Sequence, residues 1–146
     1  MALQLNRVTD YMLRCVLHLA KQPAGAVVRR RDIVAEMKIP DALFRKLAQD
    51  LKHAGILEIT QGARGGLRLA VPPEELTLLA VVKATGEEAP LNECLVRPEA
   101  CERSSICAVH RVLDAARETL YAELAAVTFA DLAAQEACLT AHAAEG

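Results

Sequence analysis

An apolar side chain occupies every third or fourth position between residues 106 and 127. These positions are Ile106, Val109, Leu113, Ala116, Leu120, Leu124 and Val127. The repeat places them on one face of a helix, close to the seam of a coiled coil. Leaving that face in water would forfeit about 1.5–3 kcal/mol for each large apolar side chain. The spacing therefore predicts a long dimerisation helix that packs on its own copy across a two-fold axis, and packing on the chain's own domain is the alternative.

The remaining composition favours helices over sheets. The apolar residues are mainly alanine, leucine and valine, and the chain of 146 residues has no tryptophan, two phenylalanines and two tyrosines. We predict a mainly α fold with a small β-hairpin. A winged helix-turn-helix domain is expected over residues 1–71, and a loop followed by the dimerisation helices over residues 72–146. Pro72 and Pro73 mark the boundary between the two parts.

The first part carries the pattern of a helix-turn-helix followed by a hairpin. Apolar spacing predicts helices over residues 9–21, 31–38 and 40–54, and strands over residues 56–60 and 67–71. The expected inward face of the third helix is formed by Leu43, Phe44, Leu47 and Leu51. Thr9 is the expected N-cap of the first helix, and Gly55 is the expected terminator of the third. In this motif the third helix enters the major groove and the hairpin forms the wing. A later helix is expected over residues 76–85. Thr128 is the expected N-cap of a final helix, with Phe129 and Leu132 returning to the core.

Charge divides the chain at the same boundary. Residues 1–71 hold twelve lysines and arginines against six aspartates and glutamates, a net charge of +6, whereas residues 72–146 have a net charge of −8. A basic half with a helix-turn-helix pattern predicts binding to double-stranded DNA. A dimer would place two recognition helices about 34 Å apart, which suits a near-palindromic operator.

Eight residues of this half are expected at the DNA. They are Arg29, Arg30, Arg31, Ala42, Arg45, Lys46, Lys52 and Arg64. Arg45 is the expected guanine reader, because its guanidinium matches O6 and N7 of that base. Lys46 and Lys52 are expected at phosphates, and Arg64 lies at a glycine-rich tip that can approach a phosphate or the minor groove. For the three consecutive arginines, a solvated run of charge is the alternative.

Three cysteines and a histidine follow one another closely in the second part. Six residues separate Cys94 from Cys101, five separate Cys101 from Cys107, and two separate Cys107 from His110. Thiolates suit iron–sulfur clusters or zinc, and the absence of a short Cys-x-x-Cys knuckle favours a cluster. Structural zinc and a thiol–disulfide switch are the alternatives. The other two cysteines, Cys15 and Cys138, lie in helical patterns and are expected in the core.

Several motifs together resemble the Rrf2 family of bacterial winged-helix regulators. They are Thr9-Asp10-Tyr11-x-Leu13-Arg14, Gly55-Ile56-Leu57, Gly62-x-Arg64-Gly65-Gly66-x-Arg68-Leu69, the three cysteines, and Thr128-x-x-Asp131-Leu132. The resemblance implies a homodimer with an iron–sulfur cluster on the loop before the dimer helix. Asp10 matches the fourth ligand of a 4Fe–4S cluster in the nitric-oxide-sensing branch, and His110 matches that of a 2Fe–2S cluster in the cluster-homeostasis branch. Of the two, Asp10 is the favoured ligand, and solvent or a small ligand is the remaining alternative. The first interval between cysteines is six residues, where five is frequent in the family.

These features predict a transcription regulator whose operator binding depends on the state of a cluster that senses nitric oxide, redox conditions or iron supply. Loss of the cluster would relax the 94–107 loop and change the spacing of the two recognition helices. No catalytic constellation is evident, so an enzyme is not expected. A small electron-transfer protein is a rival that leaves the basic half unexplained. The chain has no export signal and no stretch of about 18 apolar residues, so a cytoplasmic protein without membrane contact is expected.

Overall fold

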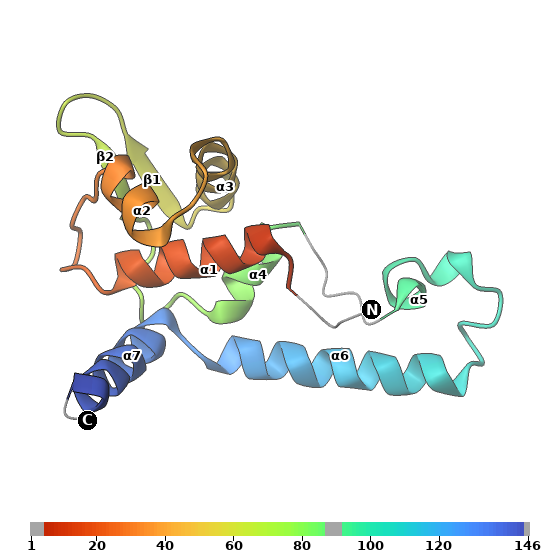
Figure 1. The fold of residues 1–146 in the computed structure, drawn as a ribbon. Coiled ribbons are helices and arrows are strands. Elements are labelled where there is room, and N and C mark those ends of the chain that lie inside the picture. Colours follow the sequence, from red (N-terminus) through yellow and green to blue (C-terminus); the bar gives the residue numbers. More distant parts are fainter. Residues whose placement is uncertain (1–4, 87–91, 145–146) are drawn as a thin grey trace.

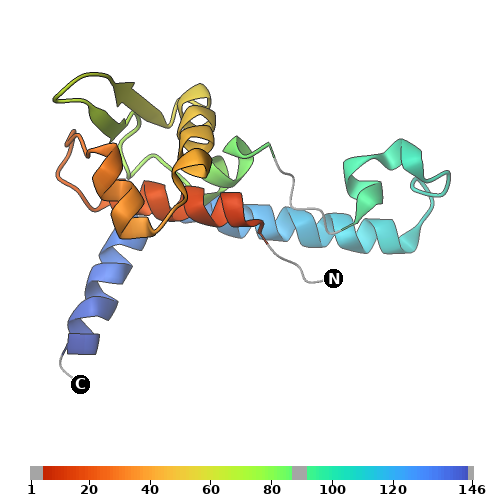
Figure 2. The ribbon, with the colours of Figure 1, turned by 45° about the horizontal axis from the view of Figure 1, so that its top comes forward.

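The computed structural model describes residues 5–86 and 92–144, and confirms a mainly helical fold with one β-hairpin (Figure 1). The elements in chain order are α1 (Arg7–Ala20), α2 (Arg30–Met37), α3 (Asp41–His53), β1 (Leu57–Thr60), β2 (Gly66–Leu69), α4 (Leu78–Ala84), α5 (Glu93–Val96), the 3₁₀ turn η1 (Pro98–Ala100), α6 (Ala108–Ala126) and α7 (Phe129–Ala144). In Figure 1, α2, α3 and the hairpin lie on one side of α1 and α6 lies on the other. In both views α6 extends past the N-terminal end of α1 (Figures 1 and 2).

Helix α1 begins two residues before its expected start. Asn6 is the N-cap, and its Oδ1 accepts a hydrogen bond from the backbone N–H of Thr9 at 2.8 Å. The prediction of Thr9 as the cap is therefore wrong. Thr9 is fully buried inside the first turn, because the apolar face of α1 continues back towards the N-terminus through Val8. Asp10 does lie in the first turn, where a carboxylate suits the positive end of the helix dipole.

The core forms where α1, α2, α3, α4 and the hairpin meet. The fully buried side chains include Met12, Cys15, Val16, Ile33, Phe44, Leu47, Leu51 and Val81. Phe44, Leu47 and Leu51 follow the spacing of one helical face, which confirms the predicted inward face of α3. Gly55 ends this helix with a φ of 74°, a conformation that a residue without Cβ adopts most readily. Burial of Cys15 is also as predicted.

The hairpin pairs Leu57 with Leu69 and Thr60 with Gly66, and a backbone bridge from Val28 to Leu67 adds a third segment. The two adjacent glycines are required by this packing. A Cβ on Gly65 would lie 2.2 Å from the Thr60 carbonyl oxygen, and one on Gly66 would lie 2.3 Å from that of Val28. Close approach of the chain's own backbone therefore accounts for these two glycines without any contact to DNA.

Helix α6 packs on α4 and α5 of its own chain, yet none of its residues is buried. Leu113, Leu120 and Leu124 are half-buried against the domain. Val109 and Val112 are 62% and 69% exposed on the adjoining face. Part of the expected apolar seam therefore packs on the chain's own domain, and part of it remains exposed to solvent.

Helix α7 begins with the predicted cap and crosses α1. Thr128 Oγ1 accepts a hydrogen bond from the Asp131 backbone N–H at 3.1 Å, and Phe129 is buried. The expectation that Cys138 belongs to the core is wrong. Its side chain is exposed, because Cys138 lies on the opposite side of α7 from the face that carries Phe129, Ala133 and Glu136 and packs on α1 and the core. Within residues 5–86 and 92–144, no helix is long and apolar enough to cross a bilayer.

Candidate nucleic-acid interface and metal-binding loop

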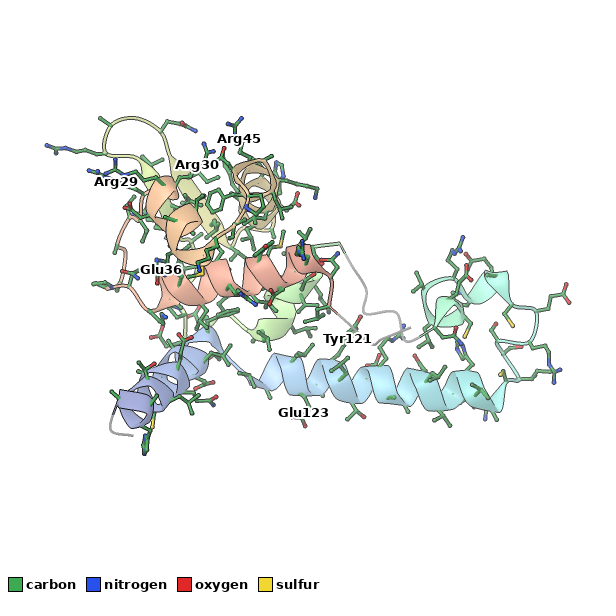
Figure 3. All side chains as sticks on the ribbon, in the orientation of Figure 1. Arg29, Arg30, Glu36, Arg45, Tyr121 and Glu123 are labelled. Atoms are coloured by element: carbon green, nitrogen blue, oxygen red, sulfur yellow. The ribbon has the colours of Figure 1, made fainter. Side chains whose placement is uncertain are left out.

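The basic residues predicted to bind DNA lie on α2, α3 and the wing. Arg29 is the N-cap of α2, and Arg30 and Arg31 are its first two residues. Ala42, Arg45, Lys46 and Lys52 lie on α3, and Arg64 lies in the turn between the strands. All eight are exposed except Arg30, which is half-buried. Arg29, Arg30 and Arg45 point away from α6 and α7 (Figure 3), so one side of the molecule gathers cations.

An open groove separates the start of α2 from the wing. It is lined by Arg29, Arg30, Arg31, Val34, Ala35, Asp41, Gly62, Ala63 and Gly65. Three arginines on one wall and a glycine-rich turn on the other make a groove that suits an anion such as a DNA phosphate. Gly62, with a φ of 103°, is the glycine of this turn whose left-handed backbone and open surroundings leave it free to approach a ligand.

Asp41 lies between Arg30 and Arg45, and it was not among the residues predicted from the sequence to belong to the DNA-binding surface. Its carboxylate pairs with Arg30 through Oδ1 and with Arg45 Nη2 through Oδ2, the latter at 3.3 Å. The hydrogen bond from Arg30, followed by the charges of Arg30 and Arg45, lowers the pKa of Asp41 below its ordinary value. The four-residue spacing of Asp41 and Arg45 on a helix is a signal that identifies this pair, whereas the pair with Arg30 depends on how α2 meets α3.

The three loop cysteines occupy three different local positions. Cys94 lies in α5, Cys101 follows η1, and Cys107 is the N-cap of α6. All three are half-buried and none forms a disulfide.

His110 lies in the first turn of α6 with its Nδ1 3.4 Å from the Cys94 Sγ. These two of the predicted ligands are in contact. The other candidate, Asp10, lies on α1 and pairs with Arg14 one turn along at 2.9 Å. Among the residues described, no three His, Cys, Asp or Glu side chains converge closely enough to hold a metal ion. The donor set itself, with three accessible thiols and an imidazole on one loop, fits a soft metal centre.

Arg117 connects α5 to α6 by hydrogen bonds, and this role was not predicted from the sequence. Its Nη1 donates to the Leu95 carbonyl oxygen at 3.0 Å, and its Nη2 pairs with Asp114 at 2.6 Å. Leu95 itself is buried, next to Cys94 in the chain. The cysteine loop is therefore attached to the helix that carries the open apolar face. The three-residue spacing of Asp114 and Arg117 on a helix is a signal that identifies this ion pair, whereas the contact of Arg117 with Leu95 depends on how α5 meets α6.

Comparison with known proteins gives consistent matches along most of the chain. Residues 5–135 match the Rrf2 family model, described as an iron-dependent transcriptional regulator. The chain is 33% identical over 135 residues to the HTH-type transcriptional regulator NsrR of Halalkalibacterium halodurans, covering 92% of both chains. It is equally identical over 138 residues to NsrR of Geobacillus kaustophilus, covering 94% of both.

Solved structures support the same fold. CymR, the global cysteine regulator of B. subtilis, superposes with a TM-score of 0.71 at 21% identity, covering 92% of this chain and 98% of that one. IscR of T. potens superposes with a TM-score of 0.74 at 16% identity, covering 91% of this chain and 88% of that one. These likenesses confirm the winged-helix architecture.

Proposed function

The chain belongs to the Rrf2 family of transcriptional regulators, and from that premise we propose that an iron–sulfur cluster on Cys94, Cys101 and Cys107 controls its binding to operator DNA. Like its relatives, the chain is a transcriptional regulator and not an enzyme. The contact between Cys94 and His110 is the observation that carries the proposal, because it joins the cysteine loop to the first turn of α6. Any change at the loop then acts directly on the helix proposed to form the dimer.

The residues of this chain have separate tasks in the proposed mechanism. The three thiolates hold the cluster, and Arg117 keeps α5 against α6 through the Leu95 carbonyl. When bound, such a cluster supplies a centre that is sensitive to nitric oxide, oxygen and iron supply. Release of the loop from α6 alters how the two copies of this helix pack. The two α3 helices then lose the spacing of about 34 Å that successive major grooves require.

A homodimer is part of the proposal. The exposed Val109 and Val112 adjoin the half-buried Leu113 and Leu120, which gives a continuous apolar strip along α6. Two copies of this strip can cover one another across a two-fold axis. The dimer presents two basic faces to a near-palindromic site on double-stranded DNA. We place this protein in the cytoplasm, where thiols stay reduced.

The fourth ligand is proposed to be His110, with Asp10 as the competing candidate. His110 already contacts Cys94 within one chain. Asp10 is held by Arg14 on the same helix and would have to give up that ion pair to reach a cluster. Single replacements by alanine separate the two, since only the true ligand should shift the visible spectrum of the anaerobic protein. An unchanged spectrum in both variants would mean that neither side chain is a ligand.

Binding to DNA before and after loss of the cluster tests the proposed function. Anaerobic protein is used to select sites from a random-sequence duplex library, and the affinity for the selected site is measured by fluorescence anisotropy. Treatment with nitric oxide or an iron chelator should change that affinity at least tenfold. Affinity should also fall steeply with added salt, because the lysine and arginine side chains that bind DNA phosphates displace condensed counterions. Equal affinity in both states contradicts control by a cluster, and a lack of any selected site contradicts the DNA-binding assignment.

A further inference from the structure

We propose that Asp41 is a specificity-determining residue that holds Arg45 in position to read a base. The inference rests on the proposed DNA-binding function and on Arg45 as the reader. It concerns a carboxylate that lies between two arginines of the proposed DNA-binding surface. A negative charge at this position weakens binding to phosphate, so we infer that the carboxylate contributes to DNA recognition in another way.

The geometry places Asp41 between two arginines from two helices. Asp41 is the first residue of α3, and Arg45 lies one turn further on the same helix. Arg45 Nη2 donates to Asp41 Oδ2 at 3.3 Å, and Arg30 at the start of α2 pairs with Oδ1. The two carboxylate oxygens are therefore divided between the two guanidinium groups. Arg30 fixes the carboxylate, and the carboxylate restrains Arg45.

The remaining donors of Arg45 are available for a base. Its side chain is 71% exposed, and within the described part of the chain Asp41 is the partner that its Nη2 contacts. A guanidinium has five N–H donors in a rigid plane, so one contact to a carboxylate leaves a second edge for O6 and N7 of guanine. An exposed arginine loses much rotamer freedom when it binds a base, and a preformed ion pair removes part of that cost before DNA arrives.

Asp41 stays ionised throughout the physiological range. The hydrogen bond from Arg30 and the nearby arginine charges lower its pKa, so the restraint does not depend on pH near neutrality. The groove beside the wing also includes Arg30 and Asp41 in its walls. Arg29 and Arg31 line the same groove, so a phosphate seated there has cations of its own while Arg30 stays with Asp41.

Asp50 provides a matched control on the same helix. It pairs with Lys46 at 2.7 Å, and the two residues are four positions apart, as Asp41 and Arg45 are. In this pair the cation comes before the aspartate in the chain, and that cation is expected to bind a phosphate and not a base. Replacing either aspartate by alanine removes one negative charge from α3. Only Asp41→Ala also removes the restraint on Arg45. Any effect of charge alone should therefore be common to the two variants.

The test is site selection from a random-sequence duplex library by the full-length wild type, Asp41→Ala, Asp50→Ala and Arg45→Ala. Wild type is expected to select one strongly preferred base pair in each half-site that Arg45→Ala loses. Asp41→Ala should weaken the preference at that same base pair about tenfold while binding unselected DNA more tightly. Asp50→Ala should bind unselected DNA more tightly and keep the preference. Thermal unfolding of each variant confirms that the comparison is between folded proteins.

Two results would overturn the inference while leaving the proposed function intact. One is a preference in Asp41→Ala within twofold of wild type, and the other is an equal loss of preference in Asp41→Ala and Asp50→Ala. A base preference that survives in Arg45→Ala also rejects it, since Asp41 then has no reader to position. Failure of wild type to select any sequence is a different outcome, because it rejects DNA binding itself.

Discussion

At the scale of single residues, burial separates one thiol from the other four. Cys15 is fully buried in α1, and burial raises its pKa to about 12. Cys94, Cys101 and Cys107 are half-buried, and Cys138 is exposed. Since the thiolate is the nucleophile, a buried thiol with a raised pKa reacts slowly with alkylating agents.

This contrast predicts the order of alkylation in metal-free native protein. At about pH 8, iodoacetamide should modify Cys138 and the three loop cysteines while Cys15 stays unmodified until the chain is unfolded. Mass spectrometry of peptides taken at successive times follows each site, and a sample in denaturant supplies the fully modified control. Modification of Cys15 at the rate of Cys138 would show that the core around α1 is open.

At the scale of elements, the start of α7 depends on a reciprocal cap. The backbone N–H of Thr128 and its hydroxyl both donate to Asp131 Oδ2, at 3.1 and 2.8 Å. These hydrogen bonds, the backbone one first, lower the pKa of Asp131 below its ordinary value of 3.8. The stabilisation from the ionised carboxylate is therefore complete above that ordinary value. It is lost as the pH falls through the lower pKa of the folded state.

Asp131→Asn should consequently be less stable than wild type at pH 7, and the difference should shrink as the pH approaches about 3. Thr128→Ala should cost about 1 kcal/mol at pH 7, as is usual for the loss of an N-cap. Urea unfolding across the pH range measures both, with Gln135→Ala on the exposed side of the same helix as control. A difference between Asp131→Asn and wild type that persists unchanged at low pH would contradict the cap.

The elements also show which features the sequence was able to predict. The inward face of α3, the wing and the cap at Thr128 follow from local spacing and local hydrogen bonds. The contact of Cys94 with His110 and the pair of Arg30 with Asp41 were not predictable, because each depends on how two separate elements pack. Cys138 was misplaced for the same reason, since a helical pattern alone does not say which face of the helix packs on the rest of the chain.

At the scale of the whole molecule, Arg29, Arg30 and Arg45 point away from α6 (Figure 3). Glu123 points from α6 away from the domain, whereas Tyr121 points towards it, and Lys83 of α4 lies 5.7 Å from the Tyr121 ring centroid. The inner side of α6 is thus occupied by its own chain. The outer side is left for the proposed second copy.

Val112→Asp should therefore disrupt the dimer with little effect on the fold of the single chain. Val112 is 69% exposed, so an aspartate there meets water in the monomer but lies in the proposed interface. Sedimentation velocity should report a dimer for wild type and a monomer for the variant. Ala125→Asp, an exposed position on the other flank of α6, adds the same charge and should leave the dimer intact. A monomeric wild type, or a dimeric Val112→Asp variant, would rule out this face of α6 as the dimer interface.

The iron and acid-labile sulfide content of anaerobically purified protein tests the cluster proposal most directly. Wild type should contain both elements in comparable amounts and absorb visible light, and Cys138→Ser should match it. Cys101→Ser should lose iron, sulfide and colour together, because Cys101 is a proposed ligand and Cys138 is not. A colourless wild type that contains zinc, with neither iron nor sulfide, would contradict the proposed cluster.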